Sequence, residues 1–351
     1  MATPGIRHFV VLTVTTGVIL FGGCSFDGQP RARLGSYATS TPGTNFLGPE
    51  NLGDHCYDHF FFENNGIVYT CRGGHIDITH LRINADYVRY LYKLILRRLD
   101  LDDTEFSFKL NVEPSRYYVT LQYPEFWKTL SEKERERLSE DLALELSQYF
   151  VFTMTTWHEI LTFYGYKCMM FVPEEPSAFS WEDIYSNLTG IHLGAKAVRD
   201  HDHGYNEAMT ILLQQELEKL GIQSARTAWE AAEKMRGKWF EGFVLINMIQ
   251  RNMDIGADDG LVTPILVPGI CEGATPLPKP VPTLELFNRH GFSMKFEVEP
   301  AEFEKDKILR IVYPDGNGKR IRFPDDLATI MEYTKNEAIK QGCIIMPPSG
   351  T

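Results

Sequence analysis

The stretch GGHIDITHLRINADYVRYLYKLILRRL, residues 73–99, joins a short extended segment to a long amphipathic helix. Its first residues have the apolar density of a strand, and Thr79 can cap the helix that follows. One face of that helix carries the apolar series Leu81, Ala85, Val88, Leu91, Ile95 and Leu99, at i, i+4, i+7 spacing. The opposite face carries Arg82, Asp86, Arg89 and Lys93. The stretch therefore predicts a strand that leads directly into a helix over 79–99.

Downstream, a hairpin is predicted over 106–123, because apolar residues alternate on both sides of Glu113-Pro114-Ser115. Helices are predicted over 131–164, 180–199, 205–220, 224–235 and 325–340, the first with a Ser131–Glu134 capping box. A second hairpin is predicted around Pro314–Gly318. No regular alternation of strand and helix appears. The fold class expected is α+β, a mainly helical body with small antiparallel sheets, forming one domain over 54–351.

The N-terminal residues have the pattern of a bacterial lipoprotein export signal. Arg7 and His8 precede an apolar run from Phe9 to Phe21, and Gly-Gly-Cys24-Ser25 follows. Residues 1–23 are therefore predicted to be removed and Cys24 to be lipidated; the alternative is an ordinary secretory signal. Ser25 after the cysteine resembles the outer-membrane sorting signal of Gram-negative lipoproteins. Residues 24–53, rich in Gly, Pro, Ser and Thr, are predicted to be a flexible tether.

The net charge and the lengths of the apolar stretches limit which partners are expected. A net charge of −12 argues against nucleic acid, which requires a basic surface. Downstream of the signal no apolar stretch is long enough to span a bilayer, so the membrane contact expected is the lipid on Cys24.

The cysteines other than Cys24 are odd in number: Cys56, Cys71, Cys168, Cys271 and Cys343. In an oxidising compartment, Cys56 and Cys71 are the predicted disulfide because they flank a predicted hairpin.

The first candidate site is the strand-to-helix corner. If 75–79 is extended, His75 and Asp77 share a face, and His80 lies in the first helical turn, where backbone N–H groups favour an anion. Imidazole and carboxylate together can also ligate a metal. The alternative is a capped corner whose polar groups satisfy one another. A Cys71/His80 nucleophile pair fits poorly, because both residues lie on one short segment.

The second candidate site is His158-Glu159, late in the long helix. Thr162 occupies the position at which a zinc-protease helix has its second histidine, so that assignment fails. Glu159 can still act as a general base, or share a metal with Asp77 and His80 if the fold brings the segments together. The alternative is a structural His/Glu pair. We expect the corner and this pair to meet in space, because a carboxylate on an apolar helix needs a partner.

Three segments resemble the bacterial lipoprotein family catalogued as domain of unknown function 4056. They are YTCRGGHIDITHLRINADYVRYLY (69–92), WHEILTFYGY (157–166) and SAFSWEDIYSNLTGIHLG (177–194). The resemblance marks these polar positions: Asp77, His80, Arg82, Asp86, His158, Glu159, Ser177, Ser180, Asp183, Tyr185, Ser186 and Asn187. His75 stands where the family pattern has an aromatic or apolar residue. A mechanism is therefore expected to depend on His80 rather than on His75. The resemblance implies the location and the fold of the protein, but it implies no reaction, because the family has no established activity.

Two functions remain open. The first is an envelope hydrolase acting on cell-wall, glycan or lipid material, with Asp77, His80, His158 and Glu159 as catalytic residues. A divalent metal held by His80, His158 and Glu159 is compatible with this chemistry. The second is a non-catalytic lipid-anchored protein that binds an envelope glycan or protein partner, with the same residues forming a structural network.

Overall fold

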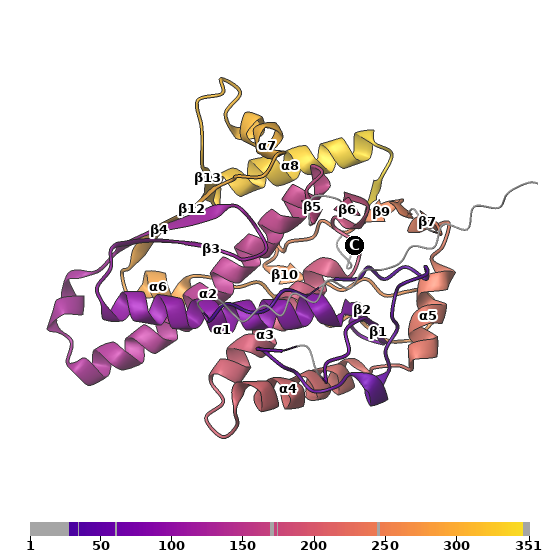
Figure 1. Cartoon of the computed structure of the whole chain (residues 1–351), viewed down its shortest axis with the longest axis horizontal. Helices are drawn as coiled ribbons and strands as arrows, with labels where there is room; N and C mark the ends of the chain where they lie inside the picture. Colours follow the sequence, from indigo (N-terminus) through magenta and orange to yellow (C-terminus); the bar gives the residue numbers. More distant parts are fainter. Residues whose placement is uncertain are drawn as a thin grey trace, which may run out of the picture.

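The computed structural model describes residues 28–33, 35–59, 62–168, 172–173, 175–243 and 246–346. It confirms the α+β class, with a mainly helical body and several small sheets (Figure 1). The predicted signal peptide and Cys24 lie outside the described residues. In the part of the chain that the structure describes, no helix has both the length and the apolar character needed to cross a membrane.

Three long helices form the centre: α1 (Ile78–Asp100), α2 (Glu132–Phe163) and α3 (Asp183–Val198). α1 buries the predicted apolar face, and the Ser131–Glu134 capping box begins α2 as expected. Two glycines let α3 approach α1 closely. A Cβ on Gly190 would lie 2.0 Å from the carbonyl oxygen of Leu81, and one on Gly194 would lie 2.6 Å from that of Ala85. Both glycines therefore serve the helix contact.

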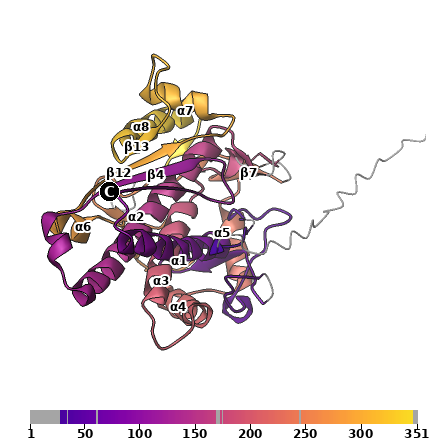
Figure 2. The ribbon, with the colours of Figure 1, turned by 60° about the vertical axis from the view of Figure 1, so that its left-hand side comes forward.

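A four-stranded antiparallel sheet packs on α2, with strand order β13-β12-β4-β3. The predicted hairpin is confirmed as β3 (Glu105–Lys109) and β4 (Arg116–Gln122). β12 (Ser293–Glu299) pairs with β4, and Phe150 of α2 stacks on Phe296 with ring centroids 4.2 Å apart. Figure 2 shows α7 and α8 on the outer side of this sheet, and α3 and α4 on the far side of α1.

The hairpin predicted around Pro314–Gly318 is wrong. β12 does pair with β13 (Ile321–Phe323), but α7 (Lys305–Val312) lies between them in the chain. Pro314 and Gly318 bound a turn that follows this helix, rather than a tight connection of two strands. The turn residues were recognised correctly, and the element before them was not.

The remaining elements surround this core. The helices are α4 (Tyr205–Leu220), α5 (Ala225–Lys234), α6 (Glu285–Arg289) and α8 (Asp325–Lys340). The short strands pair as β1 (Ile67–Thr70) with β2 (Gly74–Asp77), β5 (Lys167–Cys168) with β6 (Val172–Pro173), β7 (Phe240–Gly242) with β8 (Ile246–Met248), β9 (Gln250–Arg251) with β14 (Ile344–Ile345), and β10 (Leu261–Val262) with β11 (Lys279–Pro280).

The predicted flexible tether is wrong for residues 28–33 and 35–53, because these residues lie against the folded body. Ala38, Leu47 and Leu52 are buried. Arg33, whose side chain is fully buried, donates to Asp86 of α1 at 2.6 Å and to Glu63 at 2.9 Å. Composition suggested a linker, but a buried guanidinium held by two buried carboxylates fixes the segment in place.

The predicted Cys56–Cys71 disulfide is also wrong. Cys71 is bonded to Cys271, with the two Cα atoms 5.4 Å apart, although 200 residues separate them in the sequence. Cys56 is a buried free thiol beside Asn206 of α4, and Cys343 is also free. Cys71 follows β1, at the opposite end of that strand from the segment that holds Cys56. Proximity in sequence therefore did not indicate proximity in space.

Candidate functional site

The corner predicted from the sequence is formed by the end of β2 and the first turn of α1. Asp77, rather than Thr79, caps the helix: its Oδ1 accepts from the Thr79 backbone N–H at 2.6 Å. His80 lies in this first turn, with Nδ1 3.3 Å from Asp77 Oδ2 and 3.1 Å from Asp183 Oδ1. The imidazole is thus held between two buried carboxylates from two helices.

These carboxylates decide the charge of His80. Burial alone would lower the pKa of the imidazole, but the charges of Asp77 and Asp183, with a smaller contribution from Glu159, hold it well above the usual value. His80 is therefore an imidazolium at neutral pH. Its side chain keeps 27% exposure, whereas Asp77 is fully buried.

The start of α3 and Ser180 just before it complete the corner, and the resemblance had marked Ser180, Asp183 and Ser186 as polar positions. Ser180 donates to Asp183 Oδ2 through its backbone N–H at 3.1 Å and its hydroxyl at 2.8 Å. Ser186 Oγ accepts from the Asp77 backbone N–H at 2.9 Å and donates to the Glu182 carbonyl at 2.6 Å. These bonds fix the two carboxylates on either side of His80 and join the starts of α1 and α3.

Glu159 of α2 approaches the same place. It is 4% exposed, and its Oε2 accepts from the Phe179 backbone N–H at 2.7 Å. Burial raises the pKa of this carboxyl to about 7, with a further contribution from the charge of Asp183, and the charges of His158 and His80 act in the opposite direction. Glu159 and the corner therefore meet in one electrostatic site, without a direct hydrogen bond between Glu159 and His80.

His158 pairs with Glu113, a residue outside the corner. Its Nδ1 donates to Glu113 Oε1 at 2.6 Å, and Glu113 Oε2 in turn accepts from the Tyr117 hydroxyl at 3.0 Å. Consecutive helical residues project about 100° apart, so His158 turns to the β3–β4 hairpin while Glu159 turns to the corner. The grouping of His158 with Asp77, His80 and Glu159 in one cluster is wrong.

The predicted metal ligands are not brought together. In the ranges that the structure describes, no group of three or more His, Cys, Asp or Glu side chains is arranged to hold a metal ion. Of the set His80, His158 and Glu159, His158 is paired with Glu113, and His80 Nδ1 is directed at Asp77 and Asp183. The geometry therefore gives no support for the divalent metal that the sequence allowed.

Two parts of the site were missed from the sequence. Glu182 Oε1 accepts from the Ala38 backbone N–H at 2.6 Å, and burial, followed by the charge of Asp183, raises the pKa of Glu182 well above its usual value. The covering segment, residues 35–40, passes over the corner, and the Ser36 backbone N–H donates to Asp77 Oδ2 at 3.0 Å. Glu182 stood beside Asp183 in the motif, whereas no local signal marked the covering segment.

Other residues that the sequence singled out make contacts that hold the fold together. His75 is buried between Tyr69 and Trp181, and burial lowers its pKa to about 4. Arg82 donates to backbone carbonyls of Leu52, Gly53 and Asn64. Asp86 is buried, which alone would favour the neutral acid, but the charges of Arg33 and His55 lower its pKa to about 2. Arg82 and Asp86 thus tie Arg33 and the segments around Leu52 and Asn64 to α1, outside the corner.

Comparison with known proteins adds a family and no reaction. The family model described as "Protein of unknown function (DUF4056)" matches residues 24–258, about two thirds of the chain. No curated protein matches the chain, and no solved structure does. The match includes α1, α2 and α3, and so all the residues of the corner and Glu159. The chain therefore belongs to the DUF4056 family.

Proposed function

We propose that this protein is a hydrolase of the bacterial cell envelope that uses acid–base chemistry at Asp77, His80, Glu159 and Asp183. The observation that carries the proposal is a buried carboxyl, Glu159, whose pKa is about 7, in the electrostatic field of an imidazolium held by two carboxylates. Titratable groups whose pKa values are shifted by burial and by specific charges concentrate at active sites. These four groups come from three separate segments that the fold assembles.

Each group has a role consistent with its surroundings. With a pKa of about 7, Glu159 is present in both protonation states at neutral pH, so it can take a proton from an attacking water and return it to a leaving group. His80, held positive, can stabilise the negative charge that develops on the substrate oxygen. Asp77 and Asp183 orient the imidazole through Nδ1, so a substrate would have to reach Nε2, the edge against which Gly35 of the covering segment lies.

The expected location of the protein sets the substrate class. If Cys24 is lipidated, the folded body is attached to the membrane by a short stretch of chain, and cell-wall, glycan or lipid material is within reach. The replacement C24A tests this part alone. Radiolabelled palmitate should enter the wild-type protein and not the variant, and membrane-bound, processed C24A protein would contradict the anchor.

One observation favours a second function, that of a non-catalytic envelope protein. The covering segment lies on the corner, and its backbone N–H groups at Ser36 and Ala38 satisfy Asp77 and Glu182. In this alternative the polar groups hold the protein together, and a partner binds elsewhere. The two functions predict different effects of removing the Glu159 carboxyl. A hydrolase would lose its activity, whereas a non-catalytic protein would have no activity to lose.

The test compares E159Q with E302Q in the chain from residue 24 onward. Glu302 is a matched control, because it is also buried with a raised pKa, but it accepts from the Ser115 hydroxyl at 2.6 Å, far from the corner in sequence and in a different network. The proteins are incubated with purified cell-wall sacculi and with chromogenic glycosides and esters. We expect E159Q to lose at least about a hundredfold in rate, the usual contribution of a general acid or base, and E302Q to keep its rate.

Folding is measured on the same samples. Because the pKa of Glu159 is raised above its unfolded value, its charge destabilises the folded protein above pH 7, so E159Q should melt no lower than the wild type at pH 8. An active wild type with an equally active E159Q would exclude Glu159 as the acid–base group. A wild type that is inactive on all three substrate classes would favour the non-catalytic alternative.

A further inference from the structure

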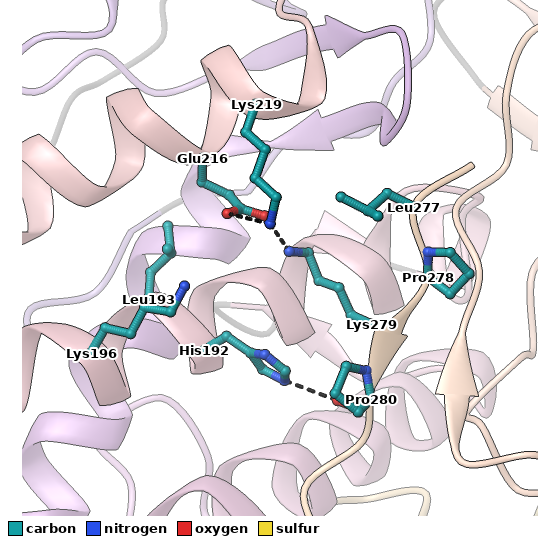
Figure 3. Close-up of a pocket in the computed structure, with 9 residues that line it drawn as sticks. All are labelled: His192, Leu193, Lys196, Glu216, Lys219, Leu277, Pro278, Lys279 and Pro280. Atoms are coloured by element: carbon teal, nitrogen blue, oxygen red, sulfur yellow. Dashed lines mark hydrogen bonds and ion pairs between the residues drawn. The ribbon is translucent and has the colours of Figure 1, made fainter. Parts of the chain in front are cut away.

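A second polar site lies on the other side of α3, in a pocket of about 160 Å³ between α3, α4 and the segment that leads into β11. Figure 3 shows His192 and Lys196 from α3, Glu216 and Lys219 from α4, and Lys279 from β11 around it. It is separate from the corner, because His192 follows Asp183 by nine residues, about 13 Å along the helix. The proposed hydrolysis does not involve this pocket.

The pocket holds an excess of positive charge. Lys279 is 7% exposed and ion-paired with Glu216, and Lys219 Nζ lies 3.7 Å from Glu216 Oε2. Burial alone would raise the pKa of Glu216, but Lys279 and then Lys219 lower it, so the carboxylate is ionised. Lys196 adds a third ammonium at the exposed rim. Three ammonium groups thus face one carboxylate, in a chain whose net charge is −12.

His192 does not add to this charge and offers a different contact. Its Nε2 donates to the Pro280 carbonyl at 2.9 Å (Figure 3). Burial, and then the charge of Lys279, lower its pKa to about 4, so the ring is neutral at pH 7. A neutral imidazole that donates through Nε2 has an acceptor at Nδ1. A bound molecule with a hydroxyl group can therefore donate to this ring.

The segment that carries Lys279 is held rigidly before anything binds. The Leu277 backbone N–H donates to the Arg72 carbonyl at 2.9 Å, and the Tyr185 hydroxyl donates to the Leu277 carbonyl at 2.8 Å. The Cys71–Cys271 disulfide ties the start of the same segment to the end of β1. A site whose cationic groups are already in place loses little entropy when an anion binds.

We propose that this pocket binds a small organic anion, with a phosphate or carboxylate head among Lys196, Lys219 and Lys279 and a short apolar part on the pocket wall. Lysine ammonium groups bind such heads as point charges, without the fixed geometry of a guanidinium fork. Leu193, Leu277 and Pro278 provide the apolar wall. The volume corresponds to about five water molecules, which suits a ligand of a few heavy atoms.

The test uses inorganic phosphate and butyrate as probes, with ionic strength kept constant by chloride. Binding is followed by thermal unfolding and by isothermal titration for the wild type, K196Q/K219Q and the charge-matched control K128Q/K133Q. All four lysines are exposed, and the control pair lies at the start of α2 and in the turn before it, away from the pocket. The substitutions should therefore leave the fold intact.

We expect at least one probe to raise the melting temperature of the wild type in a saturable way. K196Q/K219Q should bind that probe at least tenfold more weakly, equivalent to about 1.4 kcal/mol, and K128Q/K133Q should match the wild type. The probe that acts tells phosphate from carboxylate. Equal binding by all three proteins, or no effect of either probe beyond that of chloride, would overturn the proposal.

Discussion

Gly35 lies against the Nε2 edge of His80, so closely that a Cβ at position 35 would be 2.9 Å from Nε2 and 3.4 Å from Cε1. The other edge of the ring is held at Nδ1 by Asp77 and Asp183. His80 is therefore enclosed on both sides, and the covering segment is the part that controls access to Nε2.

Replacement of Gly35 by alanine should separate this segment from His80. The ring is held by two carboxylates, so we expect the covering segment to move and to lose the bond from Ser36 N–H to Asp77. Overpacking of this kind costs about 1–3 kcal/mol. The matched control is G204A, because a Cβ there meets nothing within 4 Å and φ is −66°. Chemical denaturation measures the loss, and equal stability of both variants would show that the contact is not tight.

Arg33 should be essential for holding residues 28–53 on the body. R33M leaves Glu63 and Asp86 buried without their shared guanidinium, and breaking a buried ion pair costs about 3–5 kcal/mol. R199M, which removes an exposed pair with Asp141, should cost no more than about 1 kcal/mol. Limited proteolysis should cut R33M within residues 28–53 first. Unchanged resistance of that segment would contradict the role of Arg33.

The elements recognised from sequence were those encoded by local patterns. α1 and α2 begin and end within about one residue of the expected positions, because an apolar repeat marks each helix and a cap marks its start. The β3–β4 hairpin was likewise defined by alternation on both sides of a turn. The strand-to-helix corner and Glu159 were also identified from the sequence as candidate site residues, because buried polar residues on apolar elements need partners.

The errors concern contacts between residues far apart in the chain. Arg33 and its partner Asp86 are separated by 53 residues, and Cys71 and Cys271 by 200. Nothing in the composition of residues 24–53 distinguished a segment packed on the body from a tether, because the packing depends on Asp86 and Glu63. Grouping His158 with Glu159 failed for a local reason, since neighbours on a helix face different directions.

His75 should make the protein sensitive to acid. Its pKa is about 4 in the folded state and about 6.5 when unfolded, so between these values the unfolded chain binds a proton that the folded protein does not. Stability is therefore lost as the pH falls from about 6.5 to 4, by about 3 kcal/mol in all. In H75F this loss should be absent. The Trp181 indole N–H and the Ala228 carbonyl lose a partner, so H75F should be less stable at pH 7.5 by about 1–3 kcal/mol.

The measurement is urea unfolding of the wild type and H75F at several pH values. The two stabilities should converge as the pH falls, because only the wild type loses the contribution of a neutral buried imidazole. H201F provides the control, since His201 is exposed on the turn between α3 and α4. Parallel curves for wild type and H75F would show that His75 does not cause the acid sensitivity.

The Cys71–Cys271 disulfide should be the largest single contribution to stability that a reducing agent can remove. It closes a loop of about 200 residues, for which the loss of chain entropy in the unfolded state corresponds to roughly 5 kcal/mol. The C71S/C271S variant should therefore melt well below the oxidised wild type and no longer respond to dithiothreitol. C56S is the matched control, because Cys56 is a buried free thiol, so this variant should retain the response of the wild type to dithiothreitol. If C56S loses that response while C71S/C271S keeps it, the cysteines are paired differently from the structure.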